Sequence, residues 1–535
     1  MNVLQITLFQ VLPDRQVSLP GLLALLAQDK VDSYPALRPH QAPAWHMFLV
    51  QLAALALQWA GSDQLPESEE AWTQLLRGLT AEFPDDEPWC LVVEDQSKPA
   101  FLQPPVPAGV ELKTQIPTPD ALDLLITSKN HDLKQSIAQQ AESQDWIYAL
   151  VSLQTSEGFG GAGNYGIVRM NGGSSSRPML GLAPLPPNSG KVNAPRPGAW
   201  FRRDVSVLLA TREEEQEAYS HLGYQPSRGL GLTWTAAWKE GEQLALQELD
   251  IWFIEVCRRI RFSTEAACLV AGRGTSRAAR IAGQHVNGAV GDPWAPIDLK
   301  GNKSLTLSEG DFDYKLLVKL LFSGDYRLPV LARPSTLEAT GQSLTLVAQA
   351  LSRGNSKTFG FKSRILPVGG KISRALGPKR KELHELALRQ IDEIKRFDQA
   401  LRNGLVLVAA NGKDGDSISK LSKSERDRLY TLTKEARAKF DRVADSIFFE
   451  HLWMRFEAQE LSREAMKAEE NSFAKELFSQ AQSIFAVALP SIPCARLYRP
   501  RAEARARTRF FQNVRREFPE LFPTPGIKEA QDETA

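Results

Sequence analysis

The residues that first indicate chemistry are glycines in the segment SEGFGGAGNYGIVRMNGG, residues 156–173. Gly161, Gly163 and Gly166 match the pattern G-x-G-x-x-G, and Val168 completes the longer pattern of a kinase loop. Such a loop binds nucleotide phosphates when a strand enters it and a helix follows it, because the helix N-terminus then faces the phosphates. The spacing alone therefore raises a nucleotide-dependent enzyme as one hypothesis.

The surroundings of the glycines favour a different interpretation. We expect a strand over residues 147–153 and a second, short strand over residues 167–170, so no helix begins where phosphates would lie. The chain also lacks the V-A-I-K, H-R-D and D-F-G motifs of kinases, and no Walker lysine follows the glycines. Two explanations remain: a flexible glycine hairpin, or a backbone that presses close to a ligand because no Cβ intervenes.

Positive charge is unevenly distributed along a chain that is nearly neutral overall. The 535 residues contain 64 Lys and Arg against 63 Asp and Glu, a net charge of +1, so only local charge is informative. No acidic residue lies between Glu338 and Glu382, and that interval contains nine basic residues: Arg353, Lys357, Lys362, Arg364, Lys371, Arg374, Lys379, Arg380 and Lys381. Such a strip is typical of a phosphate-binding surface.

A second basic segment, residues 496–516, has eight arginines and one acidic residue. Arg505 and Arg509 lie in it, and arginine suits phosphate contacts because its planar group donates two parallel hydrogen bonds. For both basic segments a surface that faces only solvent or another subunit remains the alternative. The glycine and serine of SRGNSKT, residues 352–358, indicate an exposed loop in the first segment.

Two further loops carry polar groups that could contact a ligand. The segment TSKNHDLK, residues 127–134, exposes hydrogen-bonding side chains that could read bases or only contact solvent. The segment DPWAP, residues 292–296, predicts a rigid turn around a tryptophan, and Lys300 and Lys303 follow in a glycine-containing turn. By itself this second segment would be the surface of a hairpin.

Metal binding and disulfide bonding are not indicated. The four cysteines and seven histidines are scattered, with no C-x-x-C or H-E-x-x-H spacing, so we expect no metal and no other cofactor. The N-terminus has no basic region and reaches Asp14 early, which is unlike a secretory signal and predicts a cytoplasmic protein. The most apolar run, residues 44–60, contains His46 and two glutamines, and we expect a buried helix in preference to a membrane span.

The predicted fold class is α+β, with a large mixed body over residues 1–375 and a C-terminal four-helix bundle over residues 380–535. In the body, the proline-rich residues 177–198 are expected to be irregular. In the bundle we expect four helices. Their predicted ranges are 380–403, a second that begins with the capping box Ser422-x-x-Glu425 and continues to Ile447, 472–488 and 500–517.

In this order, the segments resemble the CasA family, the large subunit of the type I-E CRISPR surveillance complex called Cascade. The resemblance covers essentially the whole chain, and EGFGGAGNYG, residues 157–166, is its most specific part. AWHMFLVQLAALAL (44–57), PAFLQP (99–104), the polar loop, DPWAP, the basic loop and the C-terminal helices support it.

The resemblance implies a subunit without catalytic activity of its own. Such subunits recognise the protospacer-adjacent motif (PAM) in double-stranded DNA from the minor groove and start strand separation, so that R-loop formation by the guide RNA can begin. They also dock the helicase–nuclease that degrades the target. The implied partners are target DNA, the guide crRNA, the other Cascade subunits (backbone, small and guide-end-capping) and the helicase–nuclease, with no membrane involved. A structural scaffold that binds nucleic acid is the alternative, and a nucleotide-dependent enzyme is less favoured.

The resemblance also assigns residues to PAM recognition. The glycine contact corresponds to Gly161 with Gly160 beside it, and the lysine finger to Lys300 or Lys303. The wedge loop corresponds to Asn355, Ser356 and Lys357, and the polar loop that contacts the PAM to Lys129, Asn130 and His131. The predicted contacts to the DNA backbone are Arg353, Lys362, Arg364, Arg505 and Arg509.

Two features depart from the family pattern. The best-known wedge carries a glutamine where this chain has Ser356, and because serine is short, Lys357 or Asn355 is an alternative wedge residue. Some relatives carry a cysteine-rich, zinc-ribbon-like insert, whereas residues 261–276 contain only Cys268. We therefore predict no metal in this chain.

Overall fold

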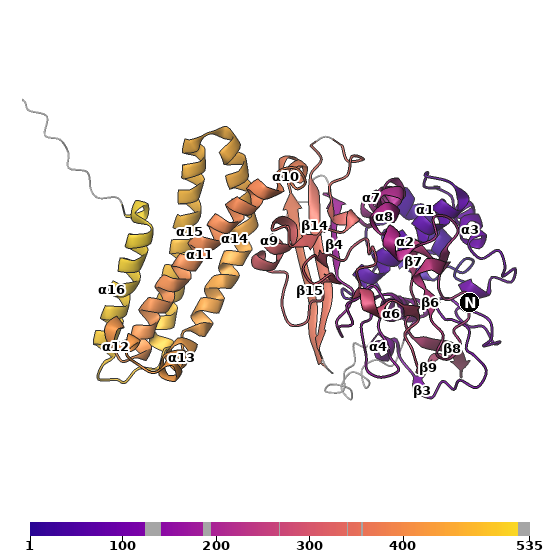
Figure 1. Ribbon diagram of the computed structural model, residues 1–535, viewed down its shortest axis with the longest axis horizontal. Coiled ribbons are helices and arrows are strands. Elements are labelled where there is room, and N and C mark those ends of the chain that lie inside the picture. Colours follow the sequence, from indigo (N-terminus) through magenta and orange to yellow (C-terminus); the bar gives the residue numbers. More distant parts are fainter. Residues whose placement is uncertain (124–140, 186–193, 267, 340, 355–356, 523–535) are drawn as a thin grey trace, which may run out of the picture. The chain divides into compact units, whose positions relative to one another are not determined.

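The computed structural model describes residues 1–123, 141–185, 194–266, 268–339, 341–354 and 357–522 (Figure 1). The chain forms two compact units, residues 1–377 and residues 378–535. The first unit, here called the body, combines helices with several small sheets, and the second is helical. The predicted α+β fold class is confirmed.

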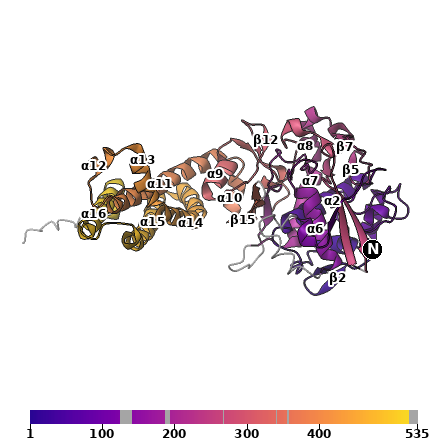
Figure 2. The same ribbon diagram turned by 90° about the horizontal axis from the view of Figure 1, so that it is seen from below.

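The body is built around α2 (Ala42–Ala60), which is the apolar run of the sequence. It packs against α6 (Ser143–Ser156) and α7 (Pro197–Ala210), and Figure 2 shows these helices together. Trp45 of α2 lies within aromatic contact of Phe9, Phe48 and Tyr148, so one side chain joins three segments of the core. Within the described residues, no helix is long and apolar enough to cross a membrane.

The longest strands are β14 (Leu344–Gly354) and β15 (Lys357–Val368), which form an antiparallel hairpin (Figure 1). β4 (Met179–Pro184) pairs with the other edge of β14. The expectation that residues 177–198 are irregular was therefore wrong for residues 179–184. MLGLAP is apolar enough to be buried beside β14, and Pro184 sits at the last position of an edge strand, where its missing N–H is tolerated.

Two strands that were predicted next to the glycines are absent. Residues 147–153 belong to α6, because a capping box at Glu142 and Asp145 starts a helix there and the helix is buried on nearly all sides. A run that is apolar throughout has no period that distinguishes helix from strand. Residues 167–170 form a turn. The Ile167 N–H donates to the backbone carbonyl of Glu157, and the Val168 N–H donates to the side-chain carboxylate of Glu255, so neither pairs with a neighbouring strand.

The remaining elements of the body are short. In chain order they are β1 (Phe9–Val11), β2 (Arg15–Val17), α1 (Leu19–Ala27), α3 (Glu69–Gly78), β3 (Thr114–Ile116), α4 (Pro119–Leu122), α8 (Arg212–Ala218), β5 (Leu230–Leu232), β6 (Leu244–Ala245), β7 (Leu249–Ile254), β8 (Arg259–Glu265), β9 (Cys268–Gly274), β10 (Ile281–Ala282), β11 (Ile297–Asp298), β12 (Lys303–Ser304), α9 (Tyr314–Phe322), β13 (Tyr326–Arg327) and α10 (Gly370–Ala375).

The C-terminal unit has four long helices, α11 (Arg380–Ala409), α14 (Lys434–Leu461), α15 (Arg463–Ser491) and α16 (Arg499–Glu517). α11 packs against each of the other three, so it is the centre of the bundle. The core is rich in stacked phenylalanines, among them the Phe485–Phe510 pair with ring centroids 4.5 Å apart.

The second predicted helix of this unit is in fact two helices. The capping box at Ser422 starts α13 (Lys423–Thr431), and α14 begins only after Thr433. Thr433 is buried, and its hydroxyl donates to the Tyr430 carbonyl at 2.8 Å. This side-chain bond competes with the helical bond of that carbonyl, which explains the break. The short α12 (Gly415–Ser419) precedes α13.

A buried ion pair joins three segments of the body. The Arg177 guanidinium donates to both carboxylate oxygens of Asp292, at 2.6 and 3.0 Å, and to the side-chain oxygen of Gln51 on α2 at 3.1 Å. The same carboxylate accepts the N–H of Trp294 at 2.8 Å, which fixes the predicted DPWAP turn. Burial by itself raises the pKa of Asp292, but Arg177 and Arg169 outweigh it and hold that pKa below its usual value.

We expect Asp292→Asn to destabilise the body by about 3–5 kcal/mol at neutral pH, because the Arg177 charge would be buried without its counter-charge. The Asp292 pKa is depressed in the folded state, so its contribution is present above the ordinary value near 4 and is lost as the pH falls through the folded pKa. Urea unfolding at several pH values measures this. The difference in unfolding free energy between the variant and wild type should become smaller below about pH 4. Asp63→Asn, an exposed control, should leave the unfolding free energy within about 0.5 kcal/mol of wild type.

Candidate nucleic-acid interface

The glycine loop, residues 157–173, begins where α6 ends and returns to its starting point. The Phe159 N–H donates to the Gly173 carbonyl at 2.9 Å, and Glu157 and Ser176 form an isolated bridge. At the tip, the Gly160 N–H donates to the Asn164 carbonyl at 2.8 Å. A helix precedes the loop and a turn follows it, which is not the strand–loop–helix arrangement that binds nucleotides.

Most glycines of this loop are required by packing or backbone conformation. A Cβ on Gly158 would lie 2.2 Å from the Gly173 carbonyl oxygen, and one on Gly166 would lie 2.6 Å from the Gly158 carbonyl carbon. Gly163 would place its Cβ 2.7 Å from that of Thr275. Gly161 has a φ of +109°, which L side chains rarely adopt, and open space in front of it.

Gly160 is the exception. Its backbone is not left-handed, and the nearest atoms to a Cβ there, in Arg258 and Asn164, lie 3.4 Å away. The fold would accept a methyl group at this exposed position. Internal packing therefore does not explain the absence of a side chain at Gly160.

Arg258 holds the two sides of the glycine loop together. Its buried guanidinium donates to the carbonyl of Gly158 at 2.8 Å on the outgoing side and to the carbonyl of Tyr165 on the returning side. Its own N–H donates to the side chain of Gln154 on α6 at 2.8 Å. The tip of the loop thus projects from a base that charge-assisted hydrogen bonds fix to the core.

Glu157, the first residue of the loop, is buried and pairs with Arg353 near the end of β14. Burial raises the pKa of Glu157, although Arg353 and Arg258 oppose the shift. The side chain of Arg353 is only 13% exposed. This ion pair connects the glycine loop to the β14–β15 hairpin, whose tip carries the predicted wedge.

Hydrogen bonds connect the returning side of the glycine loop to the lysine hairpin, here residues 297–304. The Asn171 amide donates to the Ser304 carbonyl at 2.8 Å, and the Thr306 hydroxyl donates back to Asn171 at 2.7 Å. The Ser175 hydroxyl donates to the Leu307 carbonyl at 2.5 Å. The two predicted PAM-contacting elements therefore share one base.

The same base includes the end of β14. The Leu351 N–H donates to the Ser176 hydroxyl at 2.7 Å, and the Ser176 N–H donates to the Leu351 carbonyl at 3.1 Å. The hydroxyl of Ser352 donates to the carbonyl of Ser308, beyond the lysine hairpin. We call this connected set of segments, residues 171–176, 304–308 and 351–353 with Glu157, the platform.

Lys300 lies in the turn between β11 and β12, and Lys303 is the first residue of β12. Both side chains are exposed. Asp298 stabilises the turn by accepting the Lys300 N–H at 3.1 Å, and Asn302 closes it with a φ of +42°. This short, tight turn holds Lys300 at the end of a hairpin, the position expected of a finger.

Several predicted site residues lie outside the described part of the chain. They are Lys129, Asn130 and His131 of the polar loop, together with Asn355 and Ser356 of the wedge. Lys357 is the first residue of β15. The polar loop follows Asp123, whose carboxylate is within 2.8 Å of His40 and 2.9 Å of Gln41 and whose charge contributes to the raised pKa of Glu157. Asp123 itself therefore lies close to Glu157 of the platform.

The predicted DNA-backbone residues have different surroundings. In addition to Arg353, Lys362 is paired, at 2.8 Å from Asp311, so acids distant in sequence neutralise part of the basic strip. Arg364 is half-buried on β15. Arg505 and Arg509 are exposed on α16 of the other unit, and Arg505 also donates to the Gly412 carbonyl at 2.5 Å.

Apart from Arg353, the residues that form the platform were not predicted from the sequence, and neither was the role of Arg258. Glu157 and Arg258 are charged residues within apolar segments, a pattern that indicates buried ion pairs but does not name the partners. The serines and Asn171 looked like ordinary loop residues.

Several solved structures have this architecture. The crystal structure of Thermobifida fusca Cse1 aligns with a TM-score of 0.62 over 98% of this chain and 99% of its own, at 13% identity. CRISPR-associated protein Cse1 from Acidimicrobium ferrooxidans aligns with a TM-score of 0.61 over 97% of this chain and 98% of its own, at 15% identity. Thermus thermophilus CasA (Cse1) aligns with a TM-score of 0.53 over 96% of this chain and 99% of its own, at 14% identity. No family model and no curated protein matches the sequence.

The chain has the fold of Cse1, also called CasA. The resemblance that the sequence predicted is confirmed for the fold, and it extends over nearly the whole of both chains. At 13–15% identity the likeness concerns the fold, so the function of this chain must be argued from its own residues.

Beneath the glycine loop of this Cse1 fold lies a buried acid, Glu255. It accepts the Val168 N–H at 2.8 Å. Burial raises its pKa from 4.5 to about 8, against the opposing effect of the Val168 N–H and of nearby arginines that include Arg169 and Arg280. Glu255 therefore holds a proton at neutral pH, and the base of the glycine loop is sensitive to alkaline conditions.

We expect Glu255→Gln to remove a pH dependence from the stability of the body. A raised folded-state pKa contributes stability that is complete below pH 4.5 and is lost as the pH rises through about 8. Between pH 5 and pH 9, the unfolding free energy of wild type should therefore fall by on the order of a few kcal/mol relative to that of the variant. Urea unfolding at both pH values measures this difference. An exposed control, Glu94→Gln, should follow wild type, and a Glu255→Gln profile parallel to wild type would contradict the assignment.

Proposed function

We propose that this chain is the non-catalytic large subunit of an RNA-guided CRISPR complex of the Cascade type, and that it recognises the PAM in double-stranded DNA. The observation that carries this proposal is the platform. It joins an exposed glycine tip without side chains to an exposed lysine at the end of a hairpin. The Cse1 fold supports the same assignment.

The minor groove fits this pair of elements for steric reasons. It is about 6 Å wide, and base edges lie deep between two phosphate chains. A backbone at Gly160 and Gly161 can enter where a side chain would collide with the groove walls. Lys300 would donate to the adenine N3 and thymine O2 acceptors, which look alike in both orientations of an A·T pair, so the recognition would be tolerant.

Strand separation would begin beside this contact. The wedge residues 355–357 connect β14 and β15, and the Glu157–Arg353 pair fixes the end of β14 to the glycine loop. Binding of the PAM would thus position the wedge at the first base pair of the target. Because the guide heteroduplex replaces DNA pairing at nearly balanced energy, a small contribution at this step decides whether the R-loop starts.

The other parts of the proposal concern partners. Arg364 on β15 and the exposed Arg505 and Arg509 on α16 would contact flanking duplex or displaced strand through phosphates. The chain would assemble with guide crRNA and the other subunits in the cytoplasm and would dock the helicase–nuclease. A scaffold that binds nucleic acid is the second candidate, because ion pairs already neutralise Arg353 and Lys362.

Target binding by the guide-loaded complex, assembled with and without this chain, tests the proposal. Two duplexes would match the guide and differ only in the flanking trinucleotide. The proposal requires that tight binding depends on both the chain and one flank. If the chain joins the complex but the flank preference survives its removal, the scaffold is correct. If it never joins, the Cascade assignment fails.

We expect Gly160→Ala to weaken binding of the preferred duplex by about tenfold to a hundredfold without unfolding the chain, because the methyl group meets the groove wall and not the protein. Equilibrium binding and thermal unfolding measure the two effects. Gly78→Ala, where a Cβ would meet nothing within 4 Å, is the control and should bind as wild type. Unchanged binding by Gly160→Ala would remove the glycine tip from the interface.

Lys300→Ala and Lys303→Ala distinguish the two candidate fingers. The substitution at the true finger should weaken binding of the preferred duplex by about 1–3 kcal/mol and reduce the discrimination between flanks. The other substitution should only lower affinity slightly and equally for both flanks, as loss of a phosphate contact does. Competition between the two duplexes measures the discrimination directly, and equal small losses for both variants would contradict a finger in this hairpin.

A further inference from the structure

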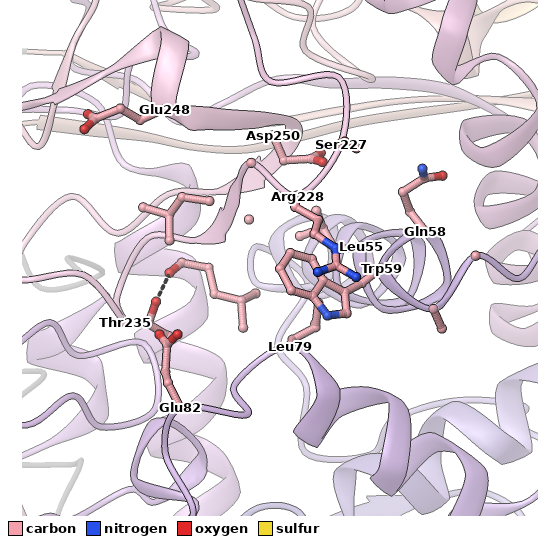
Figure 3. A pocket seen from close by; sticks show the side chains of 16 residues that line it. Leu55, Gln58, Trp59, Leu79, Glu82, Ser227, Arg228, Thr235, Glu248 and Asp250 are labelled. Atoms are coloured by element: carbon pink, nitrogen blue, oxygen red, sulfur yellow. Dashed lines mark hydrogen bonds between the residues drawn. The ribbon is translucent and has the colours of Figure 1, made fainter.

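A second site lies on the body and is not part of the platform. It is a cavity of about 620 Å³ whose lining comes from the end of α2, the region after α3, and β5 with the residues around it (Figure 3). Leu55, Leu79, Leu230 and Leu232 supply apolar surface. This volume falls within the range of ligand-binding pockets in general.

An exposed tryptophan and an arginine form one side of the cavity. Trp59 is 40% exposed at the end of α2, and the Arg228 guanidinium lies over its ring, 5.3 Å from the centroid (Figure 3). Arg228 has a φ of +55°, a left-handed backbone that is unfavourable for a residue with a Cβ.

The edge of β5 forms another part of the lining. β5 runs parallel to β7, with Leu230 opposite Leu249 and Leu232 opposite Ile254. The Thr233 N–H donates to the Ile254 carbonyl at 3.2 Å, and because backbone groups alternate sides along a strand, Gly231 faces β7 as well. Within the described residues no further strand pairs with β5. A Cβ on Gly231 would lie 2.8 Å from Leu55, so the absence of a side chain also lets this edge lie close to α2.

The charged groups of the lining are mainly acidic. Glu82 and Glu248 are exposed, and in the view of Figure 3 they lie across the opening from Trp59. Glu248 uses one carboxylate oxygen to accept the Ala245 N–H at 2.7 Å. Asp250 is already paired with the buried Arg212. Two exposed carboxylates against one exposed guanidinium leave the cavity complementary to a cation.

We propose that this cavity binds a basic segment of a partner protein and holds a lysine or arginine of that segment over Trp59. The leucines would accept apolar side chains of the same segment. Glu82 and Glu248 would pair with the basic groups. Arg228 shows that the tryptophan face accepts a guanidinium, and it occupies that face until the partner displaces it.

Peptide binding to the full chain tests this site independently of DNA recognition. The probe is a fluorescent seven-residue peptide, capped at both ends, that alternates valine with lysine, and fluorescence anisotropy measures its affinity. A peptide of the same length with glutamate in place of lysine, and a single-stranded oligothymidine, are the comparisons. The proposal requires saturable binding of the basic peptide and much weaker binding of the other two.

Substitutions on opposite sides of the cavity should act in opposite directions. Trp59→Ala should lower the affinity for the basic peptide about tenfold, and so should Glu82→Gln combined with Glu248→Gln. Arg228→Gly should tighten binding, because it removes a competing cation from the tryptophan and relieves the left-handed backbone. The exposed Glu265→Gln is the control for loss of a carboxylate elsewhere and should bind as wild type. Thermal unfolding verifies that each variant is folded.

Several outcomes would overturn the proposal. Absence of saturable binding by the basic peptide would do so, as would equal affinity for the acidic peptide. Preferential binding of oligothymidine would assign the tryptophan to nucleic acid instead. An Arg228→Gly variant that binds more weakly than wild type would show that the arginine is a ligand-binding group and not a competitor.

Discussion

The ion pair between Glu157 and Arg353 is the interaction on which the candidate interface depends. Glu157 is the first residue of the glycine loop, and Arg353 is the next-to-last residue of β14. A carboxylate buried at this point is stable only with a positive partner, since removal of either group would leave a charge in a medium of low dielectric. The pair therefore fixes two elements of the candidate interface, 196 positions apart in the sequence, to one another.

Arginines serve the body as internal connectors as well as surface charges. Arg177 joins α2 to the DPWAP turn, and Arg258 joins the two sides of the glycine loop to α6. Each uses several donors in a fixed plane, which one lysine could not reproduce. The stiffness of the platform follows from these bonds. It allows short loops to present backbone atoms and a lysine in a defined arrangement, as recognition of a narrow groove requires.

Part of this could be predicted from the sequence because the signal is local. The apolar run of α2, the spacing of apolar residues in α11 and the capping box at Ser422 depend on neighbouring residues alone. α6 was predicted as a strand because a run buried throughout has no diagnostic period. The division of α13 from α14 depends on one hydroxyl, that of Thr433, whose choice of acceptor the sequence does not reveal. The partners of Arg353 and Lys362 are distant in sequence, so a strip without local acids looked more positive than it is.

The central claim is that the glycine tip and the lysine finger read DNA from the minor groove. The most direct measurement is binding of the guide-loaded complex to duplexes whose flanking pairs are altered in one groove at a time. Inosine in place of guanine removes only the minor-groove amino group, and 7-deazaguanine or 7-deazaadenine removes only a major-groove acceptor. If recognition is from the minor groove, inosine in the flank changes the affinity and the 7-deaza bases leave it unchanged. The reverse pattern, in which the 7-deaza bases change the affinity and inosine does not, would contradict it.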